Sequence, residues 1–235
     1  MSDALADPRI ARGMARQIAL RQARLAAGAK IAGWKVGFGA PAAKEKLRLA
    51  KPLVGFLLDT ALLPNNAEVS LRGWQKPVAE PEIAVYLGRD IAAGADEQTA
   101  RVAITALGPA IELADIDCAM DDVEAILSGD IFQRHVVLGS RDTTRAGGRL
   151  QGLTAHVMRS DNDVPVPSDL EINTGGIVDI VRHVADVVTA GGERLRAGQF
   201  IIAGSLTPPL FLDPRDHALS FTLEPIGTVA CRLSH

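Results

Sequence analysis

The chain has 235 residues, of which 47% are hydrophobic and 23% are charged, and its formal net charge is −3. This length and composition indicate a globular protein that can bury a sizeable core, and they argue against intrinsic disorder. The small negative charge and the aromatic content of 4% provide neither the electrostatic attraction nor the stacking platforms that nucleic-acid binding requires.

The sequence also gives no indication of a membrane or an oxidising compartment. Cys118 and Cys231 lack the spacing of a metal site, which is typical of free thiols in a reducing cytoplasm. The N-terminus lacks the apolar stretch of a signal peptide. The apolar run at 200–212 is interrupted by Pro208 and Pro209 and is too short to span a bilayer. We therefore expect a soluble, cytoplasmic protein.

The first predicted element is an amphipathic helix. Asp7 suits its N-cap and Pro8 its first turn, apolar residues follow at helical spacing, and Gly28 suits its end. We expect the arginines of this helix to form a solvated basic face, with a membrane or an acidic partner as the alternative. They are Arg9, Arg12, Arg16, Arg21 and Arg24.

The rest of the chain predicts a mixture of strands and helices. Strands are expected at 31–38, 54–59, 76–88, 109–115, 134–138, 154–159, 200–203, 218–223 and 228–233, and helices at 41–49, 96–107, 120–127 and 176–189, with a turn at 161–163. Strands outnumber crossover helices in the second half, which favours a mixed α+β fold over an alternating one. We expect a helical and αβ region at 1–65, packed on a core at 66–235 as one structural unit.

Two glutamates in the strand at 76–88 carry the strongest functional signal. Side chains alternate between the faces of a strand, so Glu80 and Glu82 project from one face while Pro81 and Ile83 project from the other. Like charges on one half-buried face repel each other, and a buried carboxylate is costly without a partner. A bound cation would remove the repulsion, although a solvated strand face is the ordinary explanation for a single pair of this kind.

A second strand repeats this design. In the stretch 109–115, Ile111 and Leu113 form an apolar face, and Glu112 points the other way between two alanines. If the two strands are neighbours, three carboxylates meet without a histidine or cysteine, which suits a hard divalent ion, Mg²⁺ or Mn²⁺. Such an ion takes about six ligands, so roughly three positions would stay open for water or substrate oxygens. This favours catalysis over a closed structural site.

Several stretches, taken in order, resemble one enzyme family. The sequence GWKVGF at 33–38, the strand with Glu80-Pro81-Glu82 and the sequence PAIE at 109–112 occur in an order similar to that of the 2-keto-4-pentenoate hydratases, which belong to the fumarylacetoacetate hydrolase superfamily. The stretches at 195–207 and 224–229 resemble the same family. The resemblance covers about residues 8–233, and the ordered set is far more specific than any one motif.

The resemblance implies a fold, a metal and a class of substrate. It implies a mixed β-roll with helices, usually in homo-oligomers, and a divalent ion on three acidic side chains that map onto Glu80, Glu82 and Glu112. The family's strand lysine maps onto Lys35, which would bind the substrate carboxylate or transfer protons. The implied substrates are small 2-oxo or 2-hydroxydienoic acids from the breakdown of aromatic compounds. Water adds to them after a metal-stabilised enolate has formed.

The sequence departs from this family in two places. Gly175-Gly176-Ile177 stands where these hydratases commonly carry Gly-His-Pro, and the family's Asp-Asn pair is matched only by Gly129-Asp130. Either the substrate differs or another acid/base pair is used, and Asp130 and Asp59 are therefore candidate catalytic residues. Ser205 and Thr207 are candidate substrate contacts, with hydroxyls that cap a turn as the alternative.

Other functions fit parts of the sequence. The stretch 37–42 matches G-x-G-x-x-A between a strand and a helix, which weakly indicates a dinucleotide-dependent oxidoreductase with Asp59 as the ribose-binding acid. Within the family, a 2-oxo acid decarboxylase and an acylpyruvate C–C hydrolase need the same metal. The absent Gly-His-Pro leaves a noncatalytic partner subunit as a further alternative. None of the histidines has paired metal spacing, and His135 is the one expected nearest to the site.

Overall fold

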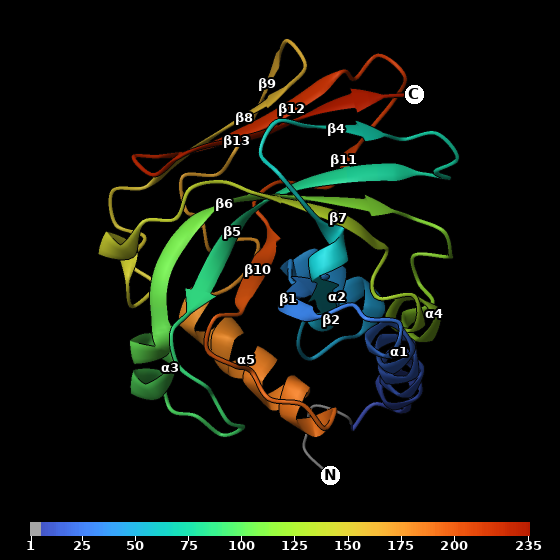
Figure 1. Ribbon diagram of the computed structural model, residues 1–235, viewed down its shortest axis with the longest axis vertical. Coiled ribbons are helices and arrows are strands. Elements are labelled where there is room, and N and C mark those ends of the chain that lie inside the picture. The colour runs from blue at the N-terminus through green and yellow to red at the C-terminus, as the bar shows by residue number, and fades with distance from the viewer. Residues whose placement is uncertain (1–5) are drawn as a thin grey trace.

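The computed structural model describes residues 6–235, whose arrangement is shown in Figure 1. Its strands are β1 (Ile31–Gly37), β2 (Leu53–Leu58), β3 (Leu62–Leu63), β4 (Ala67–Ser70), β5 (Pro77–Leu87), β6 (Ile104–Asp115), β7 (Gln133–Leu138), β8 (Thr154–Arg159), β9 (Asn162–Val164), β10 (Phe200–Ser205), β11 (Leu210–Phe211), β12 (Ala218–Glu224) and β13 (Gly227–Ser234). Its α-helices are α1 (Pro8–Ala26), α2 (Pro41–Leu47), α3 (Glu97–Ala103), α4 (Val123–Ser128) and α5 (Ile177–Ala190).

The larger of two sheets has eight strands and curls back on itself. Its order is β2-β1-β10-β5-β6-β7-β3, and β11 adds to β5. The two ends of this path, β2 and β3, are joined along the chain by a 3-10 turn of three residues, Asp59–Ala61. So short a connection spans only about 10 Å, so the two edges of the sheet must lie close together. The sheet therefore has an inner and an outer face, as in a roll.

Both faces of the rolled sheet are buried. The inner face carries a small apolar cluster, formed by Leu57, Ala84, Ala110, Val136, Phe200 and Ile202. The outer face belongs to a larger core, in which α5 packs over β1, β2 and β10, while β12 and β13 of the second sheet pack against β6. The second sheet has the order β4-β13-β12-β8-β9. The expected mixed α+β fold is confirmed.

Most predicted elements are present, with one clear exception. The helix expected at 96–107 ends at Ala103, and the strand β6 begins at Ile104 instead of near Pro109. β6 pairs with β5 over almost the whole length of that strand, from Pro77 opposite Asp115 to Leu87 opposite Ile104. This long antiparallel ladder outweighs the local helix propensity, since cross-strand pairs stabilise a sheet more than propensity stabilises an isolated turn.

One arginine of α1 contradicts the expected solvated face. Arg21 is buried, and its guanidinium lies 5.4 Å from the ring centroid of Trp34. The same guanidinium approaches the carboxylate of Glu193 at 3.6 Å. Met14, Gln17 and Arg21 share the buried face of the helix, which is therefore less apolar than the pattern of its isoleucines and leucines suggested.

The glycine-rich stretch 37–42 does not form a dinucleotide-binding motif. It does connect a strand to a helix, β1 to α2, but the next strand, β2, pairs with β1 in the antiparallel direction. A dinucleotide-binding unit requires two parallel strands joined by a crossover helix. The oxidoreductase alternative is therefore wrong for this chain.

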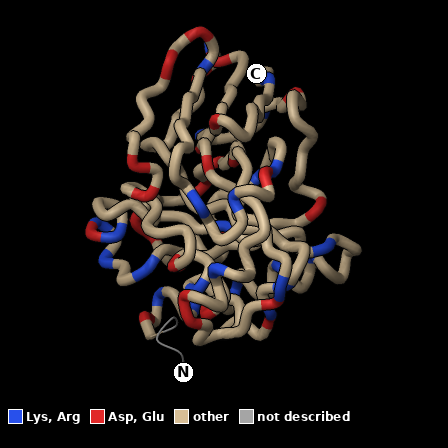
Figure 2. Tube along the Cα trace, turned by 90° about the vertical axis from the view of Figure 1, so that its left-hand side faces the viewer, with Lys and Arg blue, Asp and Glu red and all other residues tan. Residues whose placement is uncertain are grey.

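The division expected at residues 65 and 66 stays a prediction, although β1, β2 and β3 share a sheet with later strands. Figure 2 shows acidic and basic residues mixed along the chain trace. Among residues 6–235, no helix combines the length and apolar character needed to cross a bilayer.

Closure of the roll depends on the contact between β1 and β10, where Gly33 lies opposite Phe200. A Cβ atom at Gly33 would lie 2.3 Å from the carbonyl oxygen of Phe200. We expect Gly33→Ala to lower the free energy of unfolding by about 1–3 kcal/mol, because the backbone of β10 must move. At the exposed Gly129, a Cβ atom would meet no atom within 3.5 Å. Gly129→Ala is the control, and equal urea midpoints for both variants would contradict the expectation.

Candidate active site

The antiparallel pair β5–β6 gathers three glutamates on the inner face of the roll. Glu80 lies directly opposite Glu112, and Glu82 lies opposite Ala110. One carboxylate oxygen from each glutamate lies within 4.8 Å of the others. Glu82 and Glu112 are 0% exposed, while Glu80 is half-buried. The expectation that the two strands are neighbours and that their acids converge is confirmed.

A β-bulge in β10 supplies a backbone donor to this cluster. The pairing of β10 with β5 shifts by one residue between Ile202 and Ser205, so that Ser205 lies opposite Glu82. Gly204, inside the bulge, has a φ of 97°, a conformation that glycine adopts without strain. Its amide N–H donates to Oε2 of Glu82 at 2.6 Å. The bulge therefore satisfies one oxygen of a fully buried carboxylate.

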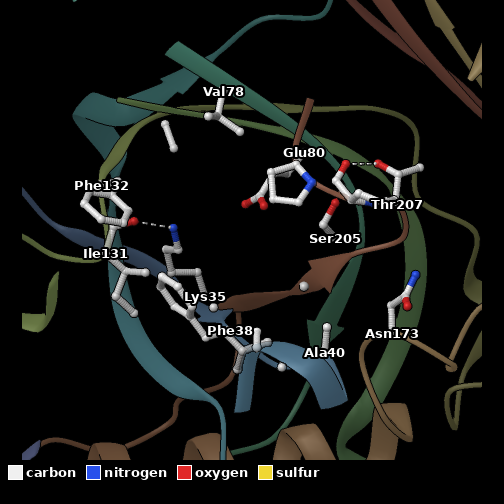
Figure 3. Close-up of a pocket in the computed structure, with 18 of the residues that line it drawn as sticks. Lys35, Phe38, Ala40, Val78, Glu80, Ile131, Phe132, Asn173, Ser205 and Thr207 are labelled. Carbon is white, nitrogen blue, oxygen red and sulfur yellow. Dashed lines mark hydrogen bonds between the residues drawn. The ribbon is translucent and has the colours of Figure 1, made fainter. Parts of the chain in front are cut away.

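Lys35 of β1 brings one positive charge to the three acids. Its side chain is 2% exposed, and its ammonium donates to Oε1 of Glu112 and, at 3.0 Å, to the carbonyl oxygen of Ile131 (Figure 3). Gly55 lies opposite Lys35 on β2, and a Cβ atom at Gly55 would lie only 2.9 Å from Cγ of Lys35. The absence of a side chain at Gly55 therefore makes room for the lysine.

The segment that accepts the second hydrogen bond of Lys35 has a strained backbone. Asp130, Ile131 and Phe132 are consecutive non-glycine residues with φ values of 61°, 53° and 64°. Such a conformation costs about 1–3 kcal/mol per residue, and it is a genuine outlier for a β-branched side chain. The segment is fixed in place because the carboxylate of Asp130 accepts the amide N–H of Phe56 at 2.9 Å. Its shape aims the carbonyl group of Ile131 at the lysine.

Burial and mutual repulsion raise the pKa values of Glu80 and Glu82. Burial, followed by the charge of Glu112, raises the pKa of Glu80 to about 7, although Lys35 opposes the shift. The same two causes raise the pKa of Glu82 well above its usual value. Burial lowers the pKa of Lys35, but the neighbouring carboxylates outweigh it and the net pKa is raised. Burial also raises the pKa of Asp130. One ammonium group thus leaves the cluster short of positive charge.

Two oxygens of the cluster have no partner in the described residues. Oε1 of Glu82 and Oε2 of Glu112 are buried and accept no hydrogen bond, and neither does the buried hydroxyl of Ser205 make one. Leaving a buried charged group unsatisfied costs several kcal/mol. A cation between the carboxylates would satisfy both oxygens, and three oxygen donors without nitrogen or sulfur fit a hard divalent ion. The donor set therefore fits Mg²⁺ or Mn²⁺.

The cluster opens into a cavity of about 460 Å³. Lys35 and Glu80 lie on its wall, Phe38 and Phe132 lie on one side, and polar residues lie near Ser205 on the other (Figure 3). The polar residues are Ser205, Thr207 and Asn173. The hydroxyl of Thr207 donates to the carbonyl oxygen of Pro208 at 3.0 Å, as expected for a hydroxyl that caps a turn.

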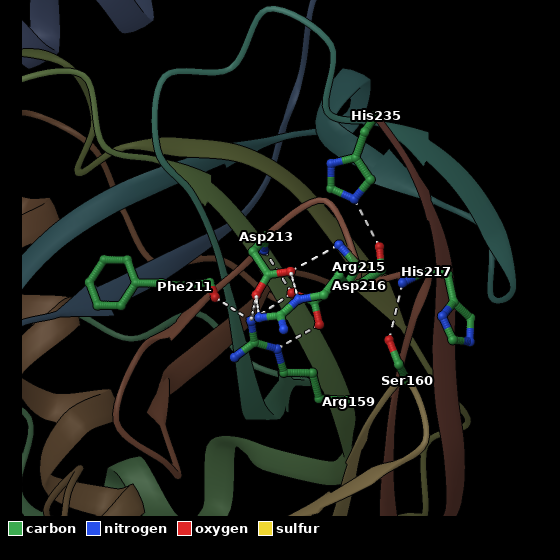
Figure 4. A network of polar contacts seen from close by, with 8 residues as sticks. All are labelled: Arg159, Ser160, Phe211, Asp213, Arg215, Asp216, His217 and His235. Atoms are coloured by element: carbon green, nitrogen blue, oxygen red, sulfur yellow. Dashed lines mark hydrogen bonds and ion pairs between the residues drawn. The ribbon is translucent and has the colours of Figure 1, made fainter.

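A polar network holds the chain segment that follows this wall (Figure 4). Arg159 donates to both carboxylate oxygens of Asp216, at 2.7 and 2.6 Å, and to the carbonyl oxygen of Phe211 at 2.6 Å. Phe211 belongs to β11, which pairs with β5 just before the glutamates. Bidentate pairs of this kind fix geometry as well as adding energy. The network therefore ties the end of the cavity wall to the second sheet.

Three parts of the chain that the sequence analysis connected with the site lie away from the cavity. Asp59 is exposed and accepts the amide N–H groups of Lys30 and Thr60, so it stabilises a turn and does not reach the cavity. His135 lies opposite Leu113, so it points away from the face that carries Glu112. The segment 175–177 begins α5 and does not line the cavity.

The sequence did not indicate three of the polar groups at the site. The amide of Gly204 and the carbonyl group of Ile131 belong to the backbone, and their directions depend on a bulge and on a strained segment. Asn173 lies in a loop without regular structure, and its side-chain amide donates to the carbonyl oxygen of Leu206 at 3.0 Å. Only the glycine before Ser205 gave any signal, since an isolated glycine in a strand often marks a bulge.

Residues 29–234 match the model of the fumarylacetoacetate (FAA) hydrolase C-terminal family. The chain belongs to the fumarylacetoacetate hydrolase family. Over 229 residues it is 30% identical to a 2-hydroxyhexa-2,4-dienoate hydratase from Comamonas testosteroni, a match that covers 92% of this chain and 84% of that protein. It is 25% identical over 232 residues to a 4-oxalocrotonate decarboxylase from Pseudomonas putida, covering 91% and 81% of the two chains.

Solved structures confirm the fumarylacetoacetate hydrolase fold. A 4-oxalocrotonate decarboxylase from Pseudomonas putida G7, complexed with magnesium and adipate, superposes with a TM-score of 0.86 at 22% identity, over 95% of this chain and 86% of that one. A fumarylpyruvate hydrolase from Pseudomonas aeruginosa, in complex with Mn²⁺ and pyruvate, superposes with a TM-score of 0.69 at 13% identity, over 86% and 88% of the chains.

The buried contact between Lys35 and Glu112 can be tested without substrate. In the presence of a chelator, we expect Lys35→Met to lower the free energy of unfolding by about 3–5 kcal/mol, because it leaves the Glu112 carboxylate without its cation. Adding Glu112→Gln should then recover part of the loss. A double-mutant cycle from urea unfolding measures the coupling, which should be at least about 1 kcal/mol. Strictly additive effects would contradict a direct interaction.

Proposed function

We propose that this protein is a divalent-metal-dependent hydro-lyase that adds water to a short 2-hydroxydienoic acid or its 2-oxo form. The observation that carries the proposal is the cluster of Glu80, Glu82 and Glu112 beside a cavity, in which Oε1 of Glu82 and Oε2 of Glu112 have no partner among the described residues. We propose these three residues as the ligands of Mg²⁺ or Mn²⁺. The 2-hydroxyhexa-2,4-dienoate hydratase at 30% identity supports hydration as the reaction.

The chemistry divides between the ion and the protein. When bound, the ion would supply a Lewis acid that stabilises negative charge on the 2-oxygen of a 2-oxo acid. Lys35 keeps a proton at Nζ, because the carboxylates around it favour its charged form. Its ammonium lies on the cavity wall, where it orients the substrate carboxylate or passes a proton to the carbon chain. The unpartnered hydroxyl of Ser205 is a donor or acceptor for a substrate oxygen.

Asp130 acts on this site through Lys35 in the proposal. Its carboxylate lies beside the lysine, since a Cβ atom at Gly55 would touch both Oδ1 of Asp130 and Cγ of Lys35. Burial favours the protonated acid. Asp130 does not line the cavity, so we propose that it positions Lys35 and does not touch substrate. Thr207, whose hydroxyl is engaged with Pro208, shapes the wall next to Ser205.

A decarboxylase is the second candidate. A 4-oxalocrotonate decarboxylase is similar to this chain over nearly its whole length, and loss of CO₂ from a 2-oxo acid needs the same stabilised negative charge. The fumarylpyruvate hydrolase that shares the fold keeps C–C bond hydrolysis as a third candidate. A noncatalytic partner subunit is not supported by these relatives, which are enzymes. Homo-oligomeric assembly and a cytoplasmic location stay as predictions.

The deciding experiment follows the ultraviolet absorbance of 2-hydroxyhexa-2,4-dienoate with purified protein and Mg²⁺ or Mn²⁺. We expect the absorbance to fall as the conjugated diene is consumed, and we expect a chelator to stop the reaction. Mass spectrometry of the product separates addition of water from loss of CO₂ and from cleavage into two acids. A chelator-resistant reaction, or no reaction with either metal, would reject the proposal.

The metal ligands are tested by Glu82→Gln. This change keeps the shape of a fully buried side chain but removes its charge, so we expect Mn²⁺ affinity to fall at least about tenfold and turnover to fall with it. The exposed Glu68 of β4 offers the matched control, and Glu68→Gln should leave both quantities unchanged. Calorimetric titration of Mn²⁺ measures the affinity directly. Wild-type affinity in Glu82→Gln would remove this residue from the ligand set.

A further inference from the structure

The cavity beside the three glutamates is charged only next to them. Among the described residues that line it, Lys35 and Glu80 are the only ionisable ones. Most of the remaining wall is apolar and is built by separate segments. It includes Phe38, Ala40, Ala42, Ala43, Val78, Ala114, Ile116, Met120, Ile131, Phe132, Pro208 and Pro209. A ligand with its polar end at the glutamates can therefore place its other end against hydrocarbon on the side of Phe38 and Phe132, while the uncharged polar residues lie on the side of Ser205.

Lys35, the one cationic residue among the described residues of the cavity wall, already has hydrogen-bond partners within the protein. The ammonium of Lys35 donates to Glu112 and to the carbonyl oxygen of Ile131. It also lies at the acidic end of the cavity, where a substrate's first carboxylate would sit. Apart from Lys35, the described lining residues include no arginine, lysine or histidine that a second carboxylate could meet. Burying an anion without a counter-charge is strongly unfavourable.

An apolar end would instead gain from the same wall. Phe38 and Phe132 form a tilted aromatic pair, with ring centroids 6.4 Å apart, on one side of the cavity (Figure 3). Ile116 and Met120 add flexible hydrocarbon from the segment between β6 and α4. A volume of about 460 Å³ accommodates a chain of several carbons beyond the 2-oxo acid group. Each methylene that this wall removes from water should strengthen binding roughly fourfold.

We propose that the substrate of this enzyme is a monocarboxylic 2-oxo or 2-hydroxydienoic acid with an uncharged apolar tail, and that dicarboxylic acids of the same length are rejected. This inference rests on the proposed function, because it places the acid group of the ligand at the metal-binding glutamates. In this proposal Phe38, Phe132 and Met120 contact the tail and determine the preference for an apolar one. The specificity comes from the missing counter-charge as much as from the apolar contacts.

Saturated 2-oxo acids test the inference without turnover. Calorimetry with the Mg²⁺-loaded protein compares 2-oxobutanoate, 2-oxopentanoate, 2-oxohexanoate and 2-oxohexanedioate. We expect affinity to rise along the three monocarboxylates, and 2-oxohexanedioate to bind at least tenfold more weakly than 2-oxohexanoate. Equal or tighter binding of the dicarboxylate would overturn the tail specificity while leaving the proposed function intact. Absence of binding by all four acids would reject both.

A charge added to the wall gives a second test. Met120 is half-buried and lines the cavity, so in Met120→Lys the long side chain can hold its ammonium toward the ligand tail. We expect the preference for 2-oxohexanoate over 2-oxohexanedioate to shrink at least tenfold. The neighbouring Ala119 is exposed and outside the lining, so Ala119→Lys adds the same charge as a control and should keep the wild-type preference. Circular dichroism confirms folding, and an unchanged preference in a folded Met120→Lys would overturn the role of this wall.

Discussion

The whole site depends on one electrostatic conflict, which the pairing of β5 with β6 creates. This pairing sets Glu80 opposite Glu112 and brings Glu82 beside them, on a face that the roll closes off from water. Like charges in such a position destabilise a sheet. The ammonium of Lys35 and the amide of Gly204 each donate a hydrogen bond to one of these carboxylates. Oε1 of Glu82 and Oε2 of Glu112 still have no partner among the described residues. The fold is thus built around a place where a doubly charged cation is the simplest remaining partner.

Around this conflict, two irregularities of the backbone serve the cluster. A bulge at Gly204 turns an amide toward Glu82, and three left-handed residues turn the carbonyl group of Ile131 toward Lys35. Regular strands present their backbone groups to neighbouring strands, so neither group would be available in an unbroken ladder. The strain at 130–132 is maintained because α4 and β7 flank the segment and Phe56 donates to Asp130.

The sequence predicted the elements that follow simple periodicity, including the two strands that carry the glutamates. Strand alternation, a local property, also placed Glu80 and Glu82 on one face and Glu112 on the face opposite its apolar neighbours, while Lys35 came from the family resemblance. Prediction from the sequence failed where long-range packing determines burial and the ends of strands. Arg21 is buried against Trp34 instead of solvated, and the strand expected to begin near Pro109 extends back to Ile104. Asp59 was placed near the site because it ends a strand, but that end faces solvent. No local pattern reveals the neighbours of a residue across a closed sheet.

The strand order has a consequence for how the protein is made. β10, at residues 200–205, inserts between β1 and β5, which are synthesised far earlier. Until β10 has been synthesised, β1 with Lys35 and β5 with two of the glutamates lack the strand that lies between them. The glutamates and Lys35 can therefore take up their final arrangement only after β10 has docked between the two earlier strands. Such long-range pairing slows folding and leaves sheet edges exposed during translation.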